Sequence, residues 1–167
     1  MNDVRSAPAI VVMGVAGCGK SVVGEALARA LGADFVEGDR LHPPENVARM
    51  ASGQALNDAM REGWLDAIGE RTAASVTGGR KVVAACSALK RSYRNRLRGF
   101  SPGVVFLYLK IDREAAWGRV ASRKGHFMPA SLVDSQFAIL EEPADDERAV
   151  TADATRSVAE IVTKALG

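Results

Sequence analysis

The chain has 167 residues, of which 47% are hydrophobic and 25% charged, as expected for one globular domain. Its formal net charge of +2 is too small to favour a nucleic-acid or membrane partner through bulk electrostatics. Cys18 and Cys86 form no CxxC pair and have no metal-like spacing with the two histidines, so a reducing cytosol is the default compartment. The apolar run AIVVMGVAG is too short to span a membrane and follows a polar start, so we expect a complete cytoplasmic protein.

Short apolar runs alternate with amphipathic segments along the chain. Strands are expected at 9–13, 34–38, 81–86, 104–110 and 148–153, the last as a weak edge strand. Helices are expected at 21–31, 44–51, 60–76, 89–98, 113–123, 129–140 and 156–166. This alternation predicts an α/β fold with a parallel sheet covered on both faces, within a single domain over 1–167.

The stretch GVAGCGKS at 14–21 fits the phosphate-loop pattern G-x-x-x-x-G-K-[ST]. It follows a buried strand directly and opens a helix, a context that disfavours the alternative of a glycine-rich turn with a chance lysine. Glycines let successive N–H groups face phosphate oxygens, Lys20 can reach the β and γ phosphates, and Ser21 can supply an oxygen to Mg²⁺. The expected ATP-binding residues of this loop are Gly14, Ala16, Gly17, Cys18, Gly19, Lys20, Ser21 and Val22.

A second polar stretch, EGDRLHPPENVARMASG at 37–53, follows the strand at 34–38. Ligands of open parallel sheets gather beyond the carboxyl ends of the strands, so Asp39 is expected beside the phosphate loop. Its carboxylate could accept the proton of a substrate hydroxyl or orient that hydroxyl. His42, Arg49 and Ser52 could line a pocket for a small, hydroxyl-rich anion. The plainer alternatives are a turn-capping Asp39, a surface-loop His42 and a solvated Arg49.

Two later segments are basic. In CSALKRSYRNRLR at 86–98, Lys90, Arg94 and Arg98 recur every four residues, as a substrate-facing or a solvated helix face; only 5% of the chain is aromatic, which disfavours a nucleic-acid patch. In GRVASRKGHFMP at 118–129, Arg119 and Arg123 lie one helical turn apart. This segment predicts a lid that closes over ATP, the alternative being an ordinary basic helix end.

The remaining polar and aromatic residues carry weaker signals. Gln136 is either a substrate contact or a helix-surface residue. The acidic run of Asp145, Asp146 and Glu147 is interpreted as a solvated loop. The two tryptophans are interpreted as packing residues; they are Trp64 and Trp117.

Three stretches, GDRLHPPENVARMASGQALND, CSALKRSYRNRLR and SRKGHFMPASLVDSQFAILEEP, resemble gluconokinases of the small phosphate-loop type. The resemblance covers about residues 9–148 and implies a three-layer fold of the nucleoside-monophosphate-kinase type, with a five-stranded parallel sheet. It also implies a substrate-binding segment at about 40–76, a lid at about 119–131 and a homodimer. The implied reaction uses ATP and Mg²⁺ to convert D-gluconate into 6-phosphogluconate.

The resemblance also assigns roles to residues. The expected catalytic residues are Lys20, Asp39 and Arg123. Arg119 is expected against the adenine and Arg123 near the phosphates. The expected substrate-binding residues are Asp39, His42, Arg49, Ser52, Arg61, Lys90, Arg94, His126 and Gln136.

Two other hypotheses remain open at this level. A kinase for another sugar acid or for shikimate would share the phosphate loop, although shikimate kinases lack the combination of GDRLHP and KGHF. A nucleotide-binding regulator without turnover would bind ATP but release no ADP in response to an acceptor.

Overall fold

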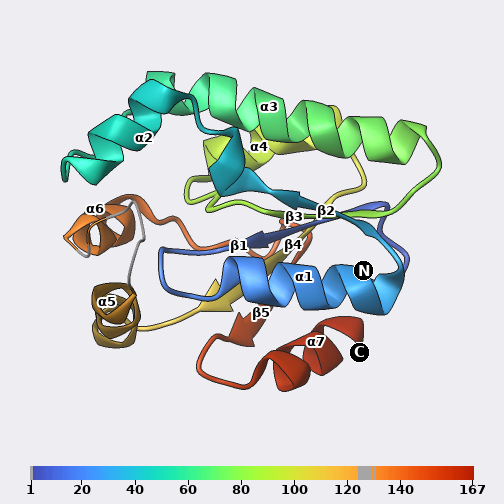
Figure 1. Ribbon diagram of the computed structural model, residues 1–167. Helices are drawn as coiled ribbons and strands as arrows, with labels where there is room; N and C mark the ends of the chain where they lie inside the picture. The colour runs from blue at the N-terminus through green and yellow to red at the C-terminus, as the bar shows by residue number, and fades with distance from the viewer. Residues whose placement is uncertain (1, 124–128, 130) are drawn as a thin grey trace.

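A computed structural model describes residues 2–123, 129 and 131–167. One five-stranded sheet runs through the molecule in the order β2-β3-β1-β4-β5, and every neighbouring pair is parallel (Figure 1). The strands are β1 (Ala9–Met13), β2 (Asp34–Glu37), β3 (Val82–Ala85), β4 (Val105–Lys110) and β5 (Ala149–Asp153). The expected parallel five-stranded sheet is confirmed, with the last strand at an edge.

Helices cover both faces of this sheet and give three layers (Figure 1). One face carries α1 (Lys20–Leu31) and α7 (Val158–Leu166), and the other carries α3 (Asp58–Thr77) and α4 (Arg91–Phe100). At the end of the sheet lie the short 3₁₀ helix η1 (Gly38–Leu41) and the helices α2 (Pro44–Ala51), α5 (Arg113–Ser122) and α6 (Leu132–Ile139). Among the described residues, no helix combines the length and the apolar character that a membrane crossing needs.

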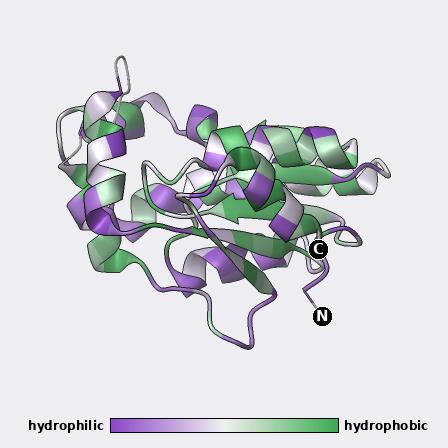
Figure 2. Ribbon diagram, turned by 90° about the horizontal axis from the view of Figure 1, so that it is seen from below, coloured by the Kyte–Doolittle hydropathy of each residue, from purple (hydrophilic) through white to green (hydrophobic). Residues whose placement is uncertain are grey.

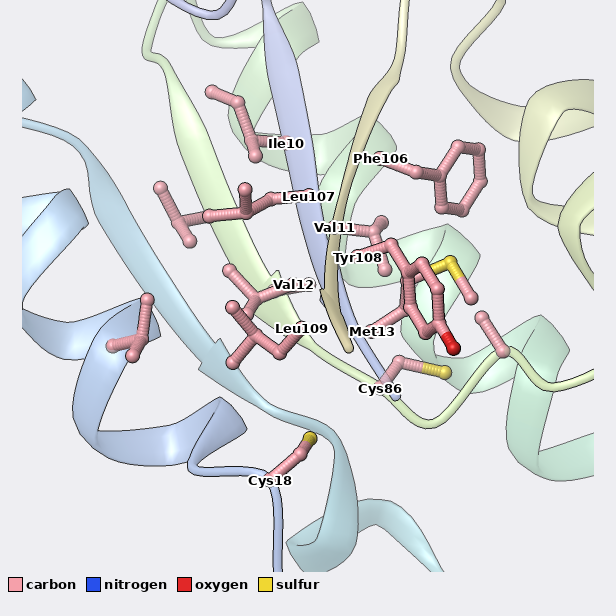
Figure 3. Packing of buried hydrophobic residues seen from close by; sticks show 14 of the residues in the cluster. Ile10, Val11, Val12, Met13, Cys18, Cys86, Phe106, Leu107, Tyr108 and Leu109 are labelled. Atoms are coloured by element: carbon pink, nitrogen blue, oxygen red, sulfur yellow. The ribbon is translucent and has the colours of Figure 1, made fainter. Parts of the chain in front are cut away.

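The core explains why the central strands lack the alternation of polar and apolar residues. Every residue of β1 is buried, as are the first five of β4. Leu107 and Leu109 point to one side of the sheet, whereas Phe106 and Tyr108 point to the other (Figure 3). Since both faces are covered, both sets of side chains must be apolar. Figure 2 accordingly shows hydrophobic strands at the centre and many hydrophilic residues in the surrounding loops.

A buried ion pair corrects two interpretations of the sequence. Arg94 and Glu147 are 0% and 5% exposed, and the guanidinium contacts both carboxylate oxygens, at 2.7 and 3.0 Å. Arg98 donates a further hydrogen bond to the same carboxylate at 2.6 Å. Glu147 is therefore not part of a solvated loop, and Arg94 is committed to the interior. Its remaining donor binds the carbonyl of Ala88 at 2.9 Å, so the pair also holds the turn that follows β3.

We predict that Glu147→Gln destabilises the protein by about 3–5 kcal/mol, because it leaves the Arg94 guanidinium buried without its counter-ion. Urea unfolding at neutral pH measures this loss. Asp146→Asn is the matched control, since its ion pair with Arg91 is exposed and is worth about 1 kcal/mol or less. Equal losses in the two variants would contradict the prediction.

The Arg94–Glu147 pair also predicts how the stability of the protein changes at acidic pH. Burial by itself raises the pKa of the Glu147 carboxyl, but hydrogen bonds from Arg94, Arg98 and the Ala144 N–H outweigh burial and lower that pKa to about 2, from 4.5. The stabilisation is thus present above about pH 4.5 and is lost as the pH falls towards 2, because the unfolded chain binds the proton first. Stability should fall less steeply in this window in Glu147→Gln than in the wild type.

Candidate active site

The register of three neighbouring strands brings their carboxyl ends to one edge of the sheet. Ala85 of β3 is aligned with Glu37 of β2 and with Val12 of β1. Beyond that line, β1 continues into the phosphate loop and β2 into η1. The turn after β3 joins them, since its Ser87 carbonyl accepts a hydrogen bond from the Gly14 N–H at 3.2 Å. The three segments therefore meet at one rim.

A cavity of about 300 Å³ opens at this rim. Both Asp39 and the phosphate loop contribute to its wall, which is the juxtaposition that phosphoryl transfer requires. Its lining residues are Ala16, Gly17, Gly19, Lys20, Ser21, Val22, Asp39, His42, Met50, Arg61, Trp64, Ser87, Arg123 and Gln136.

The phosphate loop has the backbone that its glycines allow. Gly17 and Gly19 have φ angles of 86° and 96°, in the region where a side chain is strained. Lys20 begins α1 and lines the cavity, with its ammonium donating to the Val15 carbonyl at 3.1 Å. Gly14 and Cys18 do not line the cavity. The Cys18 side chain is buried, as expected for a small spacer residue within the loop.

The part of the cavity wall formed by Asp39, His42 and Arg61 is called the acceptor side below. It is built around Trp64. Its indole N–H donates to the Gly38 carbonyl at 2.7 Å, directly before Asp39 in the chain. The His42 ring stacks on the indole with centroids 4.1 Å apart and planes 13° from parallel. Trp64 is buried, as expected, but it also lines the cavity and holds two neighbouring groups of the site. The spacing of Trp64 in the sequence predicts a buried residue but not its position in the cavity wall.

His42 is uncharged at neutral pH. Burial against Trp64 disfavours the imidazolium, and this effect outweighs the attraction of Asp39, so the pKa of His42 is lowered from 6.5 to about 4. Its Nδ1 lies 3.4 Å from the Asn46 carboxamide nitrogen. The ring therefore offers neutral hydrogen-bonding nitrogens on this side of the cavity rather than a cation.

Arg61 places its guanidinium group on the acceptor side of the cavity. The residue is 8% exposed. It donates to the Leu56 carbonyl at 2.8 Å and to the Tyr93 hydroxyl at 3.1 Å. The Tyr93 hydroxyl in turn donates to Asp58. These contacts fix the orientation of the Arg61 guanidinium, which is a prerequisite for directional anion binding.

Several expected site residues lie away from the cavity. Arg49 donates to the Ala55 carbonyl at 2.9 Å, Ser52 donates to the Arg49 carbonyl, and Lys90 pairs with Asp58 at 3.0 Å. Arg94 is fully buried and paired with Glu147, so the structure does not place it with the expected substrate-binding residues.

The lid residues divide in a similar way. Arg123 lines the cavity, whereas Arg119 braces the loop from outside, donating to the carbonyls of Gly17 and Ala154 at 3.2 and 2.9 Å. Residues 124–128, which include His126, and residue 130 belong to the predicted lid and lie outside the described residues. Trp117 is 41% exposed on α5, so its interpretation as a packing residue is wrong.

The basic segment around α4 faces acidic partners within the chain. Besides the pairs of Lys90 and Arg94, Arg91 pairs with Asp146 and Arg96 with Asp66. Arg98 shares the Glu147 carboxylate. Carboxylates within the chain therefore neutralise these arginines and this lysine. The basic helix face expected from the sequence is paired rather than free.

The residues of the cavity fit ATP and Mg²⁺. A curled loop followed by a helix N-terminus offers N–H groups to phosphate oxygens, and Lys20 adds a positive charge. The Ser21 hydroxyl supplies an oxygen donor of the kind that Mg²⁺ prefers. Within the described ranges, no cluster of three His, Cys, Asp or Glu side chains could hold a metal. Mg²⁺ bound mainly through phosphates and waters needs no such cluster.

We predict that His42 titrates with a midpoint near pH 4 in the free protein. Trp64→Leu should raise this midpoint towards 6.5, because the ring regains contact with water. Histidine ring resonances followed by NMR measure the change. Trp117→Leu is the matched control on an exposed tryptophan and should leave the midpoint unchanged. A wild-type midpoint near 6.5 would contradict the burial argument.

Comparison with known proteins agrees with this geometry. A family model described as shikimate kinase matches residues 16–165. Gluconokinase of Gluconobacter oxydans is 49% identical over 138 residues, which are 83% of this chain and 78% of the relative. Thermoresistant gluconokinase of Escherichia coli is 43% identical over 82% of this chain and 78% of its own.

Solved structures extend the likeness to three dimensions. A gluconokinase from Sinorhizobium meliloti superposes with a TM-score of 0.84 at 50% identity, covering 95% of this chain and 89% of its own. Shikimate kinase from Aquifex aeolicus shares the fold, with a TM-score of 0.63 at 14% identity over 95% of this chain and 94% of its own. The chain therefore belongs to the shikimate kinase family of phosphate-loop kinases and, within it, to the gluconokinases.

Proposed function

We propose that this protein transfers the γ-phosphoryl group of ATP to D-gluconate and releases ADP and 6-phosphogluconate. The observation that carries the proposal is the single cavity shared by Asp39 and the phosphate loop. The gluconokinase relatives, 49% and 43% identical over most of the chain, support gluconate as the acceptor.

Positioning and charge stabilisation account for the proposed catalysis, since phosphoryl transfer leaves little covalent chemistry to the protein. Lys20 and the loop N–H groups hold the β and γ phosphates. Asp39 orients the acceptor hydroxyl towards the γ-phosphorus and takes its proton. Arg123 approaches the charge that spreads over the transferred oxygens. Ser21 would help to hold Mg²⁺, which would neutralise part of that charge when bound.

The acceptor contacts are proposed for the residues that line the cavity. Arg61 presents a fixed guanidinium for the gluconate carboxylate, and His42 presents neutral nitrogens for hydroxyl groups. Arg49, Ser52 and Lys90 could join them only after exchanging their present partners. Arg119 is proposed to meet the adenine by a similar exchange.

The setting of the enzyme completes the proposal. Both cysteines are free and buried, in agreement with a cytoplasmic, reducing compartment. The homodimer implied by the family resemblance is retained as part of the proposal, and light scattering of the purified protein tests it.

A panel of sugar acids in an ADP-release assay tests the acceptor. D-gluconate should give the highest kcat/KM, well above shikimate and other aldonates. Turnover of another acid with none of gluconate would make the protein a different small-molecule kinase. ATP binding without release of ADP for any acid would favour a regulator instead.

We predict that Asp39→Asn keeps nucleotide affinity within about twofold and lowers kcat by about 10²–10⁴, because the group that accepts the hydroxyl proton is lost. Calorimetric ADP binding and the ADP-release assay measure the two effects. Lys20→Ala should instead weaken nucleotide binding itself. Asp145→Asn makes the same chemical change on an exposed loop and should leave both quantities unchanged. Near-normal kcat in Asp39→Asn would remove this residue from the mechanism.

A further inference from the structure

One hydrogen bond connects the phosphate loop to α6, the helix that follows the predicted lid. The carboxamide oxygen of Gln136 accepts from the backbone N–H of Ala16 at 2.7 Å, across 120 positions of sequence. Gln136 is 7% exposed, and both residues line the cavity. The side chain is thus neither a helix-surface residue nor merely adjacent to the loop.

Three backbone N–H groups of the loop, between Gly14 and Cys18, donate hydrogen bonds within the chain. The N–H of Gly14 donates to the Ser87 carbonyl and that of Cys18 to the Val15 carbonyl, both at 3.2 Å. The N–H of Ala16, between them, donates to Gln136. The Cys18 bond closes a turn within the loop, and the Gly14 bond ends on a backbone carbonyl, which no side-chain substitution removes. The Ala16 bond depends on the Gln136 side chain, just as the bond to the Gly17 carbonyl depends on the Arg119 side chain.

The helix that carries Gln136 is itself firmly held. Val133 is fully buried in the main core. Leu132, one turn before Gln136, belongs to a small apolar cluster with Met50 and Leu56 on the acceptor side. Asp134 pairs with Arg113 of α5 at 2.7 Å, and Figure 1 shows α6 between α2 and α5. Gln136 therefore offers its oxygen from a fixed point.

We propose that Gln136 is a positioning residue for the phosphate loop. Its carboxamide oxygen holds the Ala16 N–H and so keeps the loop in the conformation that receives the nucleotide phosphates. A buried N–H left without an acceptor is costly, so the loop of a variant without this oxygen would turn or loosen. The inference rests on the proposed kinase function, and it differs from the expectation that Gln136 contacts the sugar acid.

Two separate affinities test the role. Gln136→Met keeps the length of the side chain and removes the carboxamide, including the oxygen that accepts from Ala16. Calorimetry should show ADP binding weakened about tenfold in the absence of gluconate, as expected for one lost buried hydrogen bond. Gluconate binding in the absence of nucleotide should change less than about twofold. Weakened gluconate binding with unchanged ADP binding would overturn the proposal and make Gln136 a sugar-acid contact.

Ser135→Ala is the matched control on the same helix. Its hydroxyl donates to the Leu132 carbonyl at 2.8 Å, within α6, and both affinities should stay unchanged. Equal losses of ADP affinity in Ser135→Ala and Gln136→Met would show a general weakening of α6 and overturn the specific role.

Amide hydrogen exchange by NMR gives a readout independent of activity. In the free wild type the Ala16 N–H should exchange as slowly as the Gly14 N–H. In Gln136→Met, or in Gln136→Asn if the former fails to fold, Ala16 should exchange about tenfold faster while Gly14 does not change. Fast exchange of Ala16 in the wild type would overturn the proposal. Failure of the wild type to bind ADP would contradict the proposed function instead.

Discussion

The geometry of the site depends on how closely the chain passes over β3 at Gly38. A Cβ atom at this position would collide with the Ala85 carbonyl oxygen, so only glycine lets η1 lie against the strand. The close approach turns the next residue, Asp39, over the rim and into the cavity. The Trp64 indole then fixes the Gly38 carbonyl from the other side. Backbone packing thus sets the separation between Asp39 and the phosphate loop. A kinase needs this precision because a small misplacement of the reacting groups lowers the rate strongly.

The charged side chains of this protein act through individual ion pairs and not through a large net charge. The net charge is only +2, so the protein cannot attract a polyanion through its overall field. Around α4 the basic side chains are neutralised by acidic partners within the chain, as for Arg91 with Asp146 and Arg96 with Asp66. Lys20 and Arg123 face the cavity, and neither forms an ion pair with a carboxylate of the residues that the structure describes. Positive charge is therefore concentrated where the phosphates of the proposed substrate would lie.

The sequence predicted those features that local chemistry determines. The alternation of strands and helices, the phosphate loop and the place of Asp39 follow from short stretches whose context is contiguous in the chain. Arg94 shows the limit of this reasoning, because its spacing from Lys90 defines a helix face but does not say what covers that face. Its partner, Glu147, lies 53 positions away in a stretch that resembles a solvated loop. Trp64 and Trp117 are similar cases, since both occur in helices and only the packing distinguishes a cavity wall from an exposed surface.

The competition between burial and charge at His42 has a consequence for Asp39. Attraction between an imidazolium and the nearby carboxylate would favour a paired, protonated histidine, but the cost of burying that cation against Trp64 is larger and lowers the pKa to about 4. At neutral pH the ring is therefore neutral, and the carboxylate is not neutralised from this side. A protonated His42 would pair with the carboxylate, so the neutral ring leaves the Asp39 oxygens available to orient a substrate hydroxyl and to accept its proton. Trp64 thus supports the proposed chemistry in two ways, by fixing the backbone next to the carboxylate and by keeping its neighbour uncharged.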